Sequence, residues 1–395
     1  MELIFGGLLG GTALALWALR APSSGGVNQP EGLPILGDTI SSTLHFDSYV
    51  RYSGDKIKSN NFQPLAVCLP GKKRMLFVSH PDDLQYVLVD KAANFPKGEV
   101  THERLKELLG EGIFNSDGPA WKEHRKISSH MFSTGQLKHR MEWVFQEHCR
   151  VLVDVVEGTL AAAQTAGLDD ASLDAQALFN SFTFDSICAI AFGTQVRSLE
   201  GDAAGVRFQR VYDRCNAIAA GRNLQPEFLW QTMRKLRLGA EGEMAGGMRI
   251  LNDYVYDIIR TRKAEIEADP STLEGSKLDL LSLYFKHGRD KGREFSDEYL
   301  RDVVMNFIIA GRDTTAAALT WCLYVLCARA PELEATLLAE IREHAGEGDI
   351  SFDDAKKMVH VTAFFFETCR LFPPVPIDAK LCVEADTLPS GLAVQ

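Results

Sequence analysis

The stretch that decides the fold runs from Asp297 to Arg329 and reads DEYLRDVVMNFIIAGRDTTAAALTWCLYVLCAR. It contains no proline and a single glycine, and Ser296 precedes it as a suitable helix cap, so we predict one helix over 297–329. At 1.5 Å per residue this helix is about 50 Å long, enough to cross a whole domain. Because Asn306, Arg312 and Asp313 interrupt its apolar run, we expect a buried core helix and not a membrane span.

The middle of this helix carries residues that packing alone does not favour, AGRDTT at 310–315. A glycine inside a helix costs about 1 kcal/mol relative to alanine, and a buried carboxylate costs more. Ala310, Asp313, Thr314 and Ala317 recur at i, i+3, i+4 and i+7 and therefore share one face. Two small residues beside an acid and a hydroxyl predict a face on which a flat ligand lies and to which protons are delivered.

Two further motifs accompany this helix. Trp121 and Arg125 are four residues apart in WKEHRK, and Glu367 and Arg370 are three apart in FETCRLFPPVP. The ordered set resembles the haem-thiolate monooxygenases, the cytochrome P450 family, from about Pro34 to the last residue. The strings NFPKG, LLGEGIFNSDGPAWKEHRK and LFPPVPIDAK are similar to the fatty-acid ω-hydroxylase branch of that family.

The resemblance implies the cytochrome P450 fold, mainly α with a small β region (α+β). Helical periodicity dominates from Lys91 to Leu300, whereas 63–79 predicts two strands about a turn and the tail after Ala379 alternates like a strand. We expect a further helix over 353–371, which ends before Pro373.

The predicted domain organisation has three parts. The uncharged run inside 1–20 lies at the short limit for a membrane-spanning helix, and we prefer an uncleaved anchor to a removed signal peptide. A Pro/Gly linker follows over 21–37, and the catalytic domain occupies 38–395. The resemblance implies an anchor in the endoplasmic reticulum membrane and a cytosolic catalytic domain.

The family's iron ligand is a cysteine in a Gly-containing loop several tens of residues beyond the Glu-x-x-Arg helix. This sequence ends at Gln395, 25 residues after Arg370, and Cys382 in AKLCVEAD has no flanking glycine or arginine. We therefore expect a P450 domain that lacks its C-terminal haem-ligand region and no metal ligand within this chain.

The resemblance assigns roles to the motif residues. It implies a haem cofactor against Ala310, Gly311 and Thr314, and protons passed to bound dioxygen by Asp313 and Thr314. Gly311 would let the helix bulge, while Trp121, His124 and Arg125 would hold a haem propionate. Glu367 and Arg370 would form a buried structural ion pair. Without the resemblance, a kinked core helix whose Thr hydroxyls bond the i−4 carbonyl explains the same central residues.

The substrate pocket follows from the resemblance alone, and its residues are mostly apolar: Ile113, Phe114, Leu224, Phe228, Val375 and Ile377. The implied reaction is insertion of one oxygen atom of dioxygen into a C–H bond of a lipophilic substrate. Fatty-acid ω-hydroxylation is the leading hypothesis, and sterols or terpenoids are alternative substrates. A haem-free, membrane-tethered remnant or partner-binding domain is an alternative from another functional class.

Composition and charge restrict the classes of partner that the protein can bind. A net charge of −11 makes nucleic acid a poor partner, and eight cysteines without a C-x-x-C fit neither a zinc site nor a disulfide framework. Within this acidic chain, residues 122–140 carry eight Lys, Arg and His residues, and Glu123 is the only acid among them. This basic stretch is either a solvated helix face or a docking surface for an acidic electron donor. The resemblance implies that the donor is an NADPH-dependent flavoprotein reductase.

Overall fold

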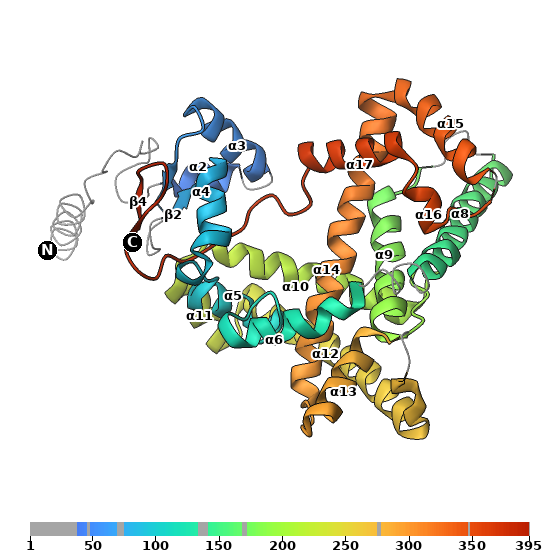
Figure 1. Cartoon of the computed structure of the whole chain (residues 1–395), viewed down its shortest axis with the longest axis horizontal. Coiled ribbons are helices and arrows are strands. Elements are labelled where there is room, and N and C mark those ends of the chain that lie inside the picture. The colour runs from blue at the N-terminus through green and yellow to red at the C-terminus, as the bar shows by residue number, and fades with distance from the viewer. Residues whose placement is uncertain are drawn as a thin grey trace, which may run out of the picture. The chain divides into compact units, whose positions relative to one another are not determined.

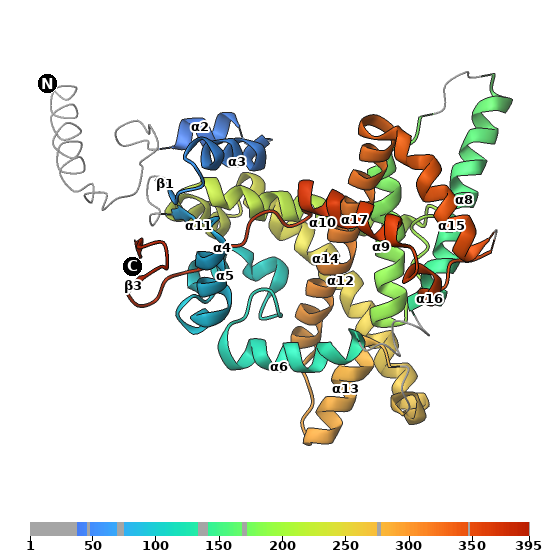
Figure 2. The ribbon, with the colours of Figure 1, turned by 45° about the horizontal axis from the view of Figure 1, so that its top comes forward.

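The computed structural model describes residues 38–45, 48–68, 75–132, 141–167, 172–274, 278–346 and 348–394. Helices dominate this part of the chain, with two short antiparallel strand pairs, as Figure 1 and Figure 2 show. The predicted anchor and linker lie outside the described residues. None of the described helices combines the length and apolarity needed to cross a membrane.

The chain divides into two compact units, which we describe separately. The first draws on 1–104, 217–245 and 379–395, and the second on 105–216 and 246–378. Helices α5 (Gly98–Leu109), α10 (Ala203–Gly221) and α12 (Gly239–Ala268) continue from one unit into the other.

The first unit holds all the described β structure. Strands β1 (Leu65–Val67) and β2 (Met75–Phe77) pair antiparallel, as the sequence predicts for 63–79. A second pair joins β3 (Asp386–Thr387) to β4 (Ala393–Val394). The other elements of this unit are α2 (Thr39–Leu44), α3 (Tyr49–Ser59), α4 (Pro81–Gln85), the single π turn η2 (Tyr86–Asp90), the 3-10 turns η3 (Ala92–Asn94) and η6 (Arg222–Leu224), and α11 (Glu227–Leu236).

The strand predicted directly after Ala379 is misplaced. Leu381 and Val383 are extended, but their backbone N–H groups donate to carbonyls of Pro96 and Asn94, and the regular strand begins only at Asp386. The tail therefore attaches to a distant loop, 94–96, through contacts that local alternation does not reveal.

The second unit is helical. It contains α6 (Gly118–Ser129), η4 (His130–Phe132), α8 (Glu142–Thr165), α9 (Ala175–Phe192), η7 (Pro270–Leu273), α13 (Leu280–Lys291), α14 (Asp297–Tyr324), η8 (Val325–Arg329), η9 (Pro331–Leu333), α15 (Glu334–Ala345), α16 (Phe352–Ala355) and α17 (Val359–Leu371). Helix α14 packs along α9 and contacts α17, as Figure 1 and Figure 2 show. The buried partner α9 begins at a cap in which Asp174 accepts from the Ala177 N–H, and it ends at Gly193 with φ +70°.

The predicted helix over 297–329 is confirmed as one continuous helical span. The Ser296 hydroxyl accepts from the Tyr299 N–H at 3.2 Å, and the helix is α up to Tyr324 and π-helical over Val325–Arg329. Most of its N-terminal half is buried, including Val303, Val304 and Ile308, so the expectation of a core helix is also confirmed.

The predicted single helix over 353–371 is wrong, because α16 and α17 are separate. Glu340 on α15 explains the restart: its two carboxylate oxygens accept from the N–H groups of His360 (3.0 Å) and Val361 (2.8 Å). These contacts cap the first turn of α17 from a neighbouring helix. Local sequence carries no sign of such a cap.

Candidate active site

One face of α14 stays partly open in the middle of this core helix. Ala310, Asp313, Thr314 and Ala317, which share that face, are all half-buried. Among the other residues of the same turns, Arg312, Ala316 and Ala318 are buried and Thr315 is exposed. The structure therefore leaves the predicted ligand face without full cover from the described protein.

Gly311 serves helix packing and not a bulge. The helix is regular through this residue, so the predicted bulge is wrong. A Cβ placed on Gly311 would lie 2.6 Å from Cδ1 of Ile187 and 2.6 Å from its Cγ1. The absence of a side chain lets α9 approach α14 directly behind the open face.

The Thr314 hydroxyl is engaged with its own helix. Its Oγ1 donates to the carbonyl of Ala310 at 2.6 Å, the geometry of a threonine that back-bonds to residue i−4. The hydroxyl oxygen keeps its acceptor capacity for a group lying on the open face. A catalytic role of this hydroxyl therefore requires it to rotate away from Ala310 when it donates a proton.

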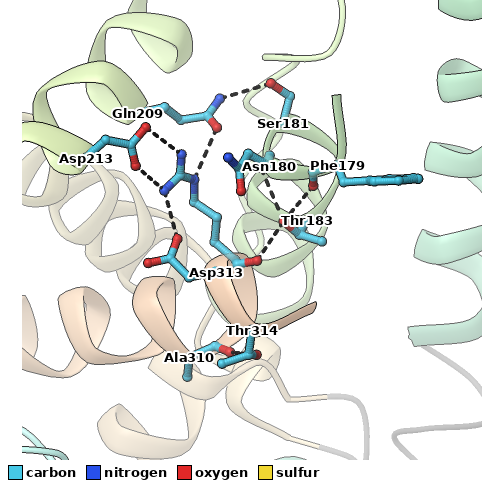
Figure 3. A network of polar contacts seen from close by, with 10 residues as sticks. Phe179, Asn180, Ser181, Thr183, Gln209, Asp213, Ala310, Asp313 and Thr314 are labelled. Carbon is cyan, nitrogen blue, oxygen red and sulfur yellow. Dashed lines mark hydrogen bonds and ion pairs between the residues drawn. The ribbon is translucent and has the colours of Figure 1, made fainter. Parts of the chain in front are cut away.

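The buried side chain of Arg312 is the centre of a polar network, shown in Figure 3. Its guanidinium donates from Nη1 to Oδ1 of Asp213 (2.6 Å) and to Oδ1 of Asp313 (2.8 Å), and from Nη2 to Oδ2 of Asp213 (3.1 Å). Its Nε donates to Oε1 of Gln209 at 3.2 Å. The carbonyl of Arg312 accepts from Thr183 on α9 at 3.0 Å. These partners cannot be predicted from the sequence around Arg312, because α9 and α10 lie about 100 or more positions before it in the chain.

The surroundings of Asp313 favour its neutral form. Burial raises the pKa of this carboxyl, the Arg312 guanidinium lowers it, and the Asp213 carboxylate raises it again, so that the pKa lies above its usual value. A carboxyl group with a raised pKa takes up and releases protons closer to neutral pH, which suits proton transfer.

The loop that carries Ile113 and Phe114 is fastened to α14 next to the open face. The Glu111 N–H donates to Asp302 at 2.8 Å, and the Phe114 N–H donates to Oδ1 of Asn306 at 2.8 Å. Asn306 lies four residues before Ala310 and hence on the same face. Ile113 is half-buried and Phe114 is exposed at the N-terminal end of that face.

Two glycines make this attachment of the loop possible. Side chains on Gly110 and Gly112 would overlap with Asp302 and Asn306, and Gly110 also has φ +53°. The Asn306 amide in turn donates to the carbonyl of Leu109 at 2.7 Å. The backbone of the loop therefore lies in direct contact with side chains of α14.

Helix α6 separates the predicted propionate ligands. Trp121 and Arg125 share an exposed face, but His124 is buried. The His124 ring contacts the Tyr284 hydroxyl through Nδ1 (2.9 Å) and the carbonyl of Glu111 through Nε2 (3.0 Å), and it stacks on Tyr299. Burial lowers the pKa of His124, so the ring is neutral near pH 7. The structure gives His124 a role in holding the Glu111 loop, and we leave it out of the haem-binding set.

The predicted pocket residues divide between the two units. Leu224 and Phe228 belong to the first unit, where Leu224 is half-buried and Phe228 exposed. Val375 and Ile377 belong to the second unit and are exposed, like Phe114. The loop of Ile113 and Phe114 is hydrogen-bonded to α14 through the Phe114 N–H.

The Glu367–Arg370 pair forms but is not buried. Arg370 donates from Nε to Oε2 of Glu367 (2.7 Å) and from Nη2 to Oε1 (2.6 Å), while the side chains are 57% and 66% exposed for Glu367 and Arg370. The expectation of a buried pair is therefore wrong for the described structure. The apolar neighbours Phe365 and Phe366 are themselves exposed and do not cover the charges. An exposed ion pair of this kind contributes little to stability.

A family model for cytochrome P450 matches residues 30–394. The chain belongs to the cytochrome P450 family. It is 30% identical to cytochrome P450 704B1 of Arabidopsis thaliana over 93% of this chain and 74% of that protein. It is also 30% identical to cytochrome P450 94A2 of Vicia sativa, over 93% of this chain and 69% of that protein.

The fold of this P450 is confirmed by solved structures. The crystal structure of the cytochrome P450DA heme domain matches 93% of this chain and 75% of that chain with a TM-score of 0.73 at 20% identity. The mainly α fold with a small β region is thereby confirmed as the P450 fold. Family membership makes the protein a P450 monooxygenase, an oxidoreductase with a haem cofactor.

The described residues fit a haem on one side only. The half-buried α14 face of small and polar residues suits a flat ring, and exposed Arg125 offers a guanidinium for a propionate. A thiolate ligand needs a lowered thiol pKa. Burial instead raises the pKa of Cys188, Cys322 and Cys382, and the Cys382 thiol donates to the carbonyl of Glu384 at 3.0 Å. In these surroundings none of those three cysteines suits an iron ligand.

Proposed function

We propose that this P450 hydroxylates a fatty acid or a similarly long apolar substrate, with α14 forming the distal wall of the haem site. The observation that supports this proposal is the row of half-buried residues Ala310, Asp313, Thr314 and Ala317 on one face of α14, directly after the buried run Val303–Ile308. When bound, the haem supplies activation of dioxygen for insertion of one oxygen atom into a C–H bond.

The residues of this chain would divide the remaining work. Ala310 and Ala317 would leave room for the haem, and Thr314 would offer its hydroxyl to a bound ligand. Asp313, with its raised pKa, would carry protons from solvent towards Thr314. Trp121 and Arg125, which share the exposed face of α6, would hold a propionate, because a guanidinium grips a carboxylate through two parallel N–H groups.

The apolar pocket residues support a hydrocarbon substrate. Phe114 carries an exposed ring at the edge of the α14 face, where its backbone is fixed by Asn306. Apolar walls with few polar groups suit an alkyl chain, whose free energy of binding comes from the area that it buries. The similarity of the strings at 94–98, 108–126 and 371–380 to ω-hydroxylases supports fatty acids over sterols or terpenoids.

The proposed function also includes a membrane location and an electron donor. We place the enzyme at the endoplasmic reticulum membrane, anchored through 1–20, with an NADPH-dependent flavoprotein reductase as its electron donor. Lys122, Arg125, Lys126 and His130 are exposed on α6 and η4 and form the described part of the basic stretch, whereas His124 is buried and 133–140 lie outside the described residues. Exposed positive charges would steer an acidic partner into contact.

Product analysis tests the substrate. The haem-loaded enzyme with a reductase and NADPH is given saturated fatty acids of several chain lengths, a sterol and a monoterpene. We expect hydroxylated fatty acids as the main products, together with a substrate-induced shift of the haem spectrum. Turnover of the sterol or monoterpene with no fatty-acid product would overturn the proposed substrate class.

The exposed Glu367–Arg370 pair and the raised pKa values of the thiols favour a second candidate, a haem-free domain that binds a partner. Haem titration of the 395-residue chain, followed by the reduced carbon-monoxide spectrum, tests whether one of its cysteines can ligate the iron. We expect no thiolate-type Soret band from the chain itself. Such a band, lost in Cys382→Ser, would show that Cys382 can serve as the ligand.

A further inference from the structure

We infer that Asp213 on α10 is a positioning residue for the Asp313 carboxyl group, because the two aspartates compete for one buried guanidinium. The inference rests on the proposed function, in which Asp313 carries protons. It adds a residue that no motif contains and that lies 100 positions before Asp313 in the chain.

Asp213 and Asp313 accept different numbers of hydrogen bonds from the Arg312 guanidinium. The Arg312 side chain is 2% exposed, so its charge must be satisfied inside the protein. Asp213 takes both terminal nitrogens through two oxygens, whereas Asp313 receives one N–H from Nη1. In Figure 3 the Asp313 carboxylate faces the guanidinium to which Asp213 is also bonded, while Thr314 lies beside Ala310.

The guanidinium itself is held in place. Its Nε donates to Gln209, whose amide donates in turn to Ser181 on α9 at 3.3 Å, and the group lies 5.5 Å from the ring centre of Tyr212. Thr183 fixes the backbone carbonyl of Arg312. Arg312 therefore has partners on both neighbouring helices and is held in place. What can change in this network is which N–H groups of the guanidinium each of the two carboxylates accepts.

The charges around Asp313 leave one negative charge uncompensated. Arg312 on α14 faces it with one positive charge, and α10 contributes the carboxylate of Asp213 and the phenol of Tyr212, while the contacts from α9 are the uncharged Ser181 and Thr183. The Asp213 side chain is 55% exposed, whereas that of Asp313 is 30% exposed. Burial and the neighbouring Asp213 carboxylate both raise the pKa of Asp313.

Asp213 thus keeps Asp313 usable as a proton donor. If Asp213 were neutral, Arg312 would turn its second N–H to Asp313 and hold that carboxylate ionised. Two changes then act in the same direction on the pKa of Asp313: a repelling charge is lost and an attracting contact is gained. Both lower the pKa and withdraw the proton that Thr314 would receive.

Infrared spectroscopy of the protonated carboxyl band measures this directly. The band of Asp313 is assigned in each background by subtracting the spectrum of the corresponding Asp313→Asn variant, in the haem-loaded enzyme and in the 395-residue chain. In Asp213→Asn and Asp213→Ala we expect its titration midpoint to fall by about one pH unit or more. Asp213→Glu, which keeps the charge, should restore it. Asp253→Asn, an exposed change of the same charge on α12, should leave it unchanged.

Turnover then distinguishes the positioning of Asp313 by Asp213 from proton transfer through Asp313. We expect the product formed per NADPH to fall in Asp213→Asn, with its high-pH limb moved to lower pH. An unchanged infrared midpoint in both Asp213 variants that retain the helical circular dichroism of the wild type would overturn the inference. A shifted midpoint with normal coupling in both Asp213→Asn and Asp313→Asn would leave the positioning intact and refute proton transfer through Asp313.

Discussion

Gly311 of α14 and Ile187 of α9 are in such close contact that a single added methyl group would lie 2.6 Å from two carbon atoms of the isoleucine. Gly311 also stands directly before Arg312 and Asp313, so this contact sets the spacing of the two helices at the polar network. A glycine that weakens the helix locally is retained because it permits the close approach of α9.

Gly311→Ala is expected to destabilise the protein. Alanine gains about 1 kcal/mol of helix propensity, but overpacking against Ile187 costs about 1–3 kcal/mol, so we expect a net loss in the free energy of unfolding. Urea denaturation measures it. Gly158→Ala in α8, where no atom of another helix or distant side chain lies within 4 Å of the added methyl group, is the matched control and should stabilise the protein. Adding Ile187→Ala to Gly311→Ala should relieve the clash, and a double variant no better than additive would contradict this account.

Asn306 is expected to hold the Phe114 loop. Asn306→Ala leaves the Phe114 N–H and the Leu109 carbonyl without their partner, which should cost about 1–3 kcal/mol of stability. Hydrogen exchange at the Phe114 amide should accelerate more than at amides in α13. Asn306→Asp keeps the acceptor for Phe114 and should retain slow exchange there. Equal exchange in the alanine variant and the wild type would show that the loop is held by other contacts.

Thr314→Ala is expected to uncouple the haem-loaded enzyme. Without the hydroxyl on the ligand side, NADPH and dioxygen are still consumed, while hydroxylated product falls by about tenfold or more and peroxide rises. Simultaneous assays of NADPH, peroxide and product give the coupling ratio. Thr314→Ser keeps a hydroxyl and should recover much of it. Full coupling in the alanine variant would leave Thr314 with only its hydrogen bond to Ala310.

The pH dependence of stability should report the raised pKa of Asp313. A folded pKa above the unfolded value means that the folded state binds the proton more tightly, so the stability associated with this group is present at low pH and is lost as pH rises through the folded pKa. Relative to wild type, Asp313→Asn should therefore gain stability above that pH, and the difference should shrink on acidification. Denaturation at a series of pH values tests the sign, and a difference that grows towards low pH would contradict it.

The basic stretch is expected to govern encounter with the reductase. Neutralising Lys122, Lys126 and Lys138 to glutamine should lower the electron-transfer rate at low salt by roughly tenfold and flatten its dependence on ionic strength. Arg125 is left unchanged because its proposed propionate contact would confound docking with loss of haem. Substrate-induced spectra serve as the control and should not change. Parallel salt curves for the triple variant and the wild type would mean that these lysines are only a solvated face.

Local sequence was sufficient for the long helix and its special face. The cap at Ser296, the missing prolines and the recurrence of Ala310, Asp313, Thr314 and Ala317 all depend on neighbours within a few positions, so they predict the helix, its N-terminus and the four residues that share one face. The hairpin of β1 and β2 was predicted for the same reason. The ordered motifs also identified the P450 family, which the family model confirms.

Tertiary structure alone decided what those residues contact. The sequence does not indicate that Gly311 faces Ile187, that Arg312 is divided between Asp213 and Asp313, or that Glu340 starts α17 anew. It also placed His124 with Trp121 and Arg125, although the helix turns the imidazole into the core. Each of these pairings joins groups on different helices or different sides of one helix. Their free energies come from close packing and from satisfying buried charges, which exist only once the chain has brought distant segments together.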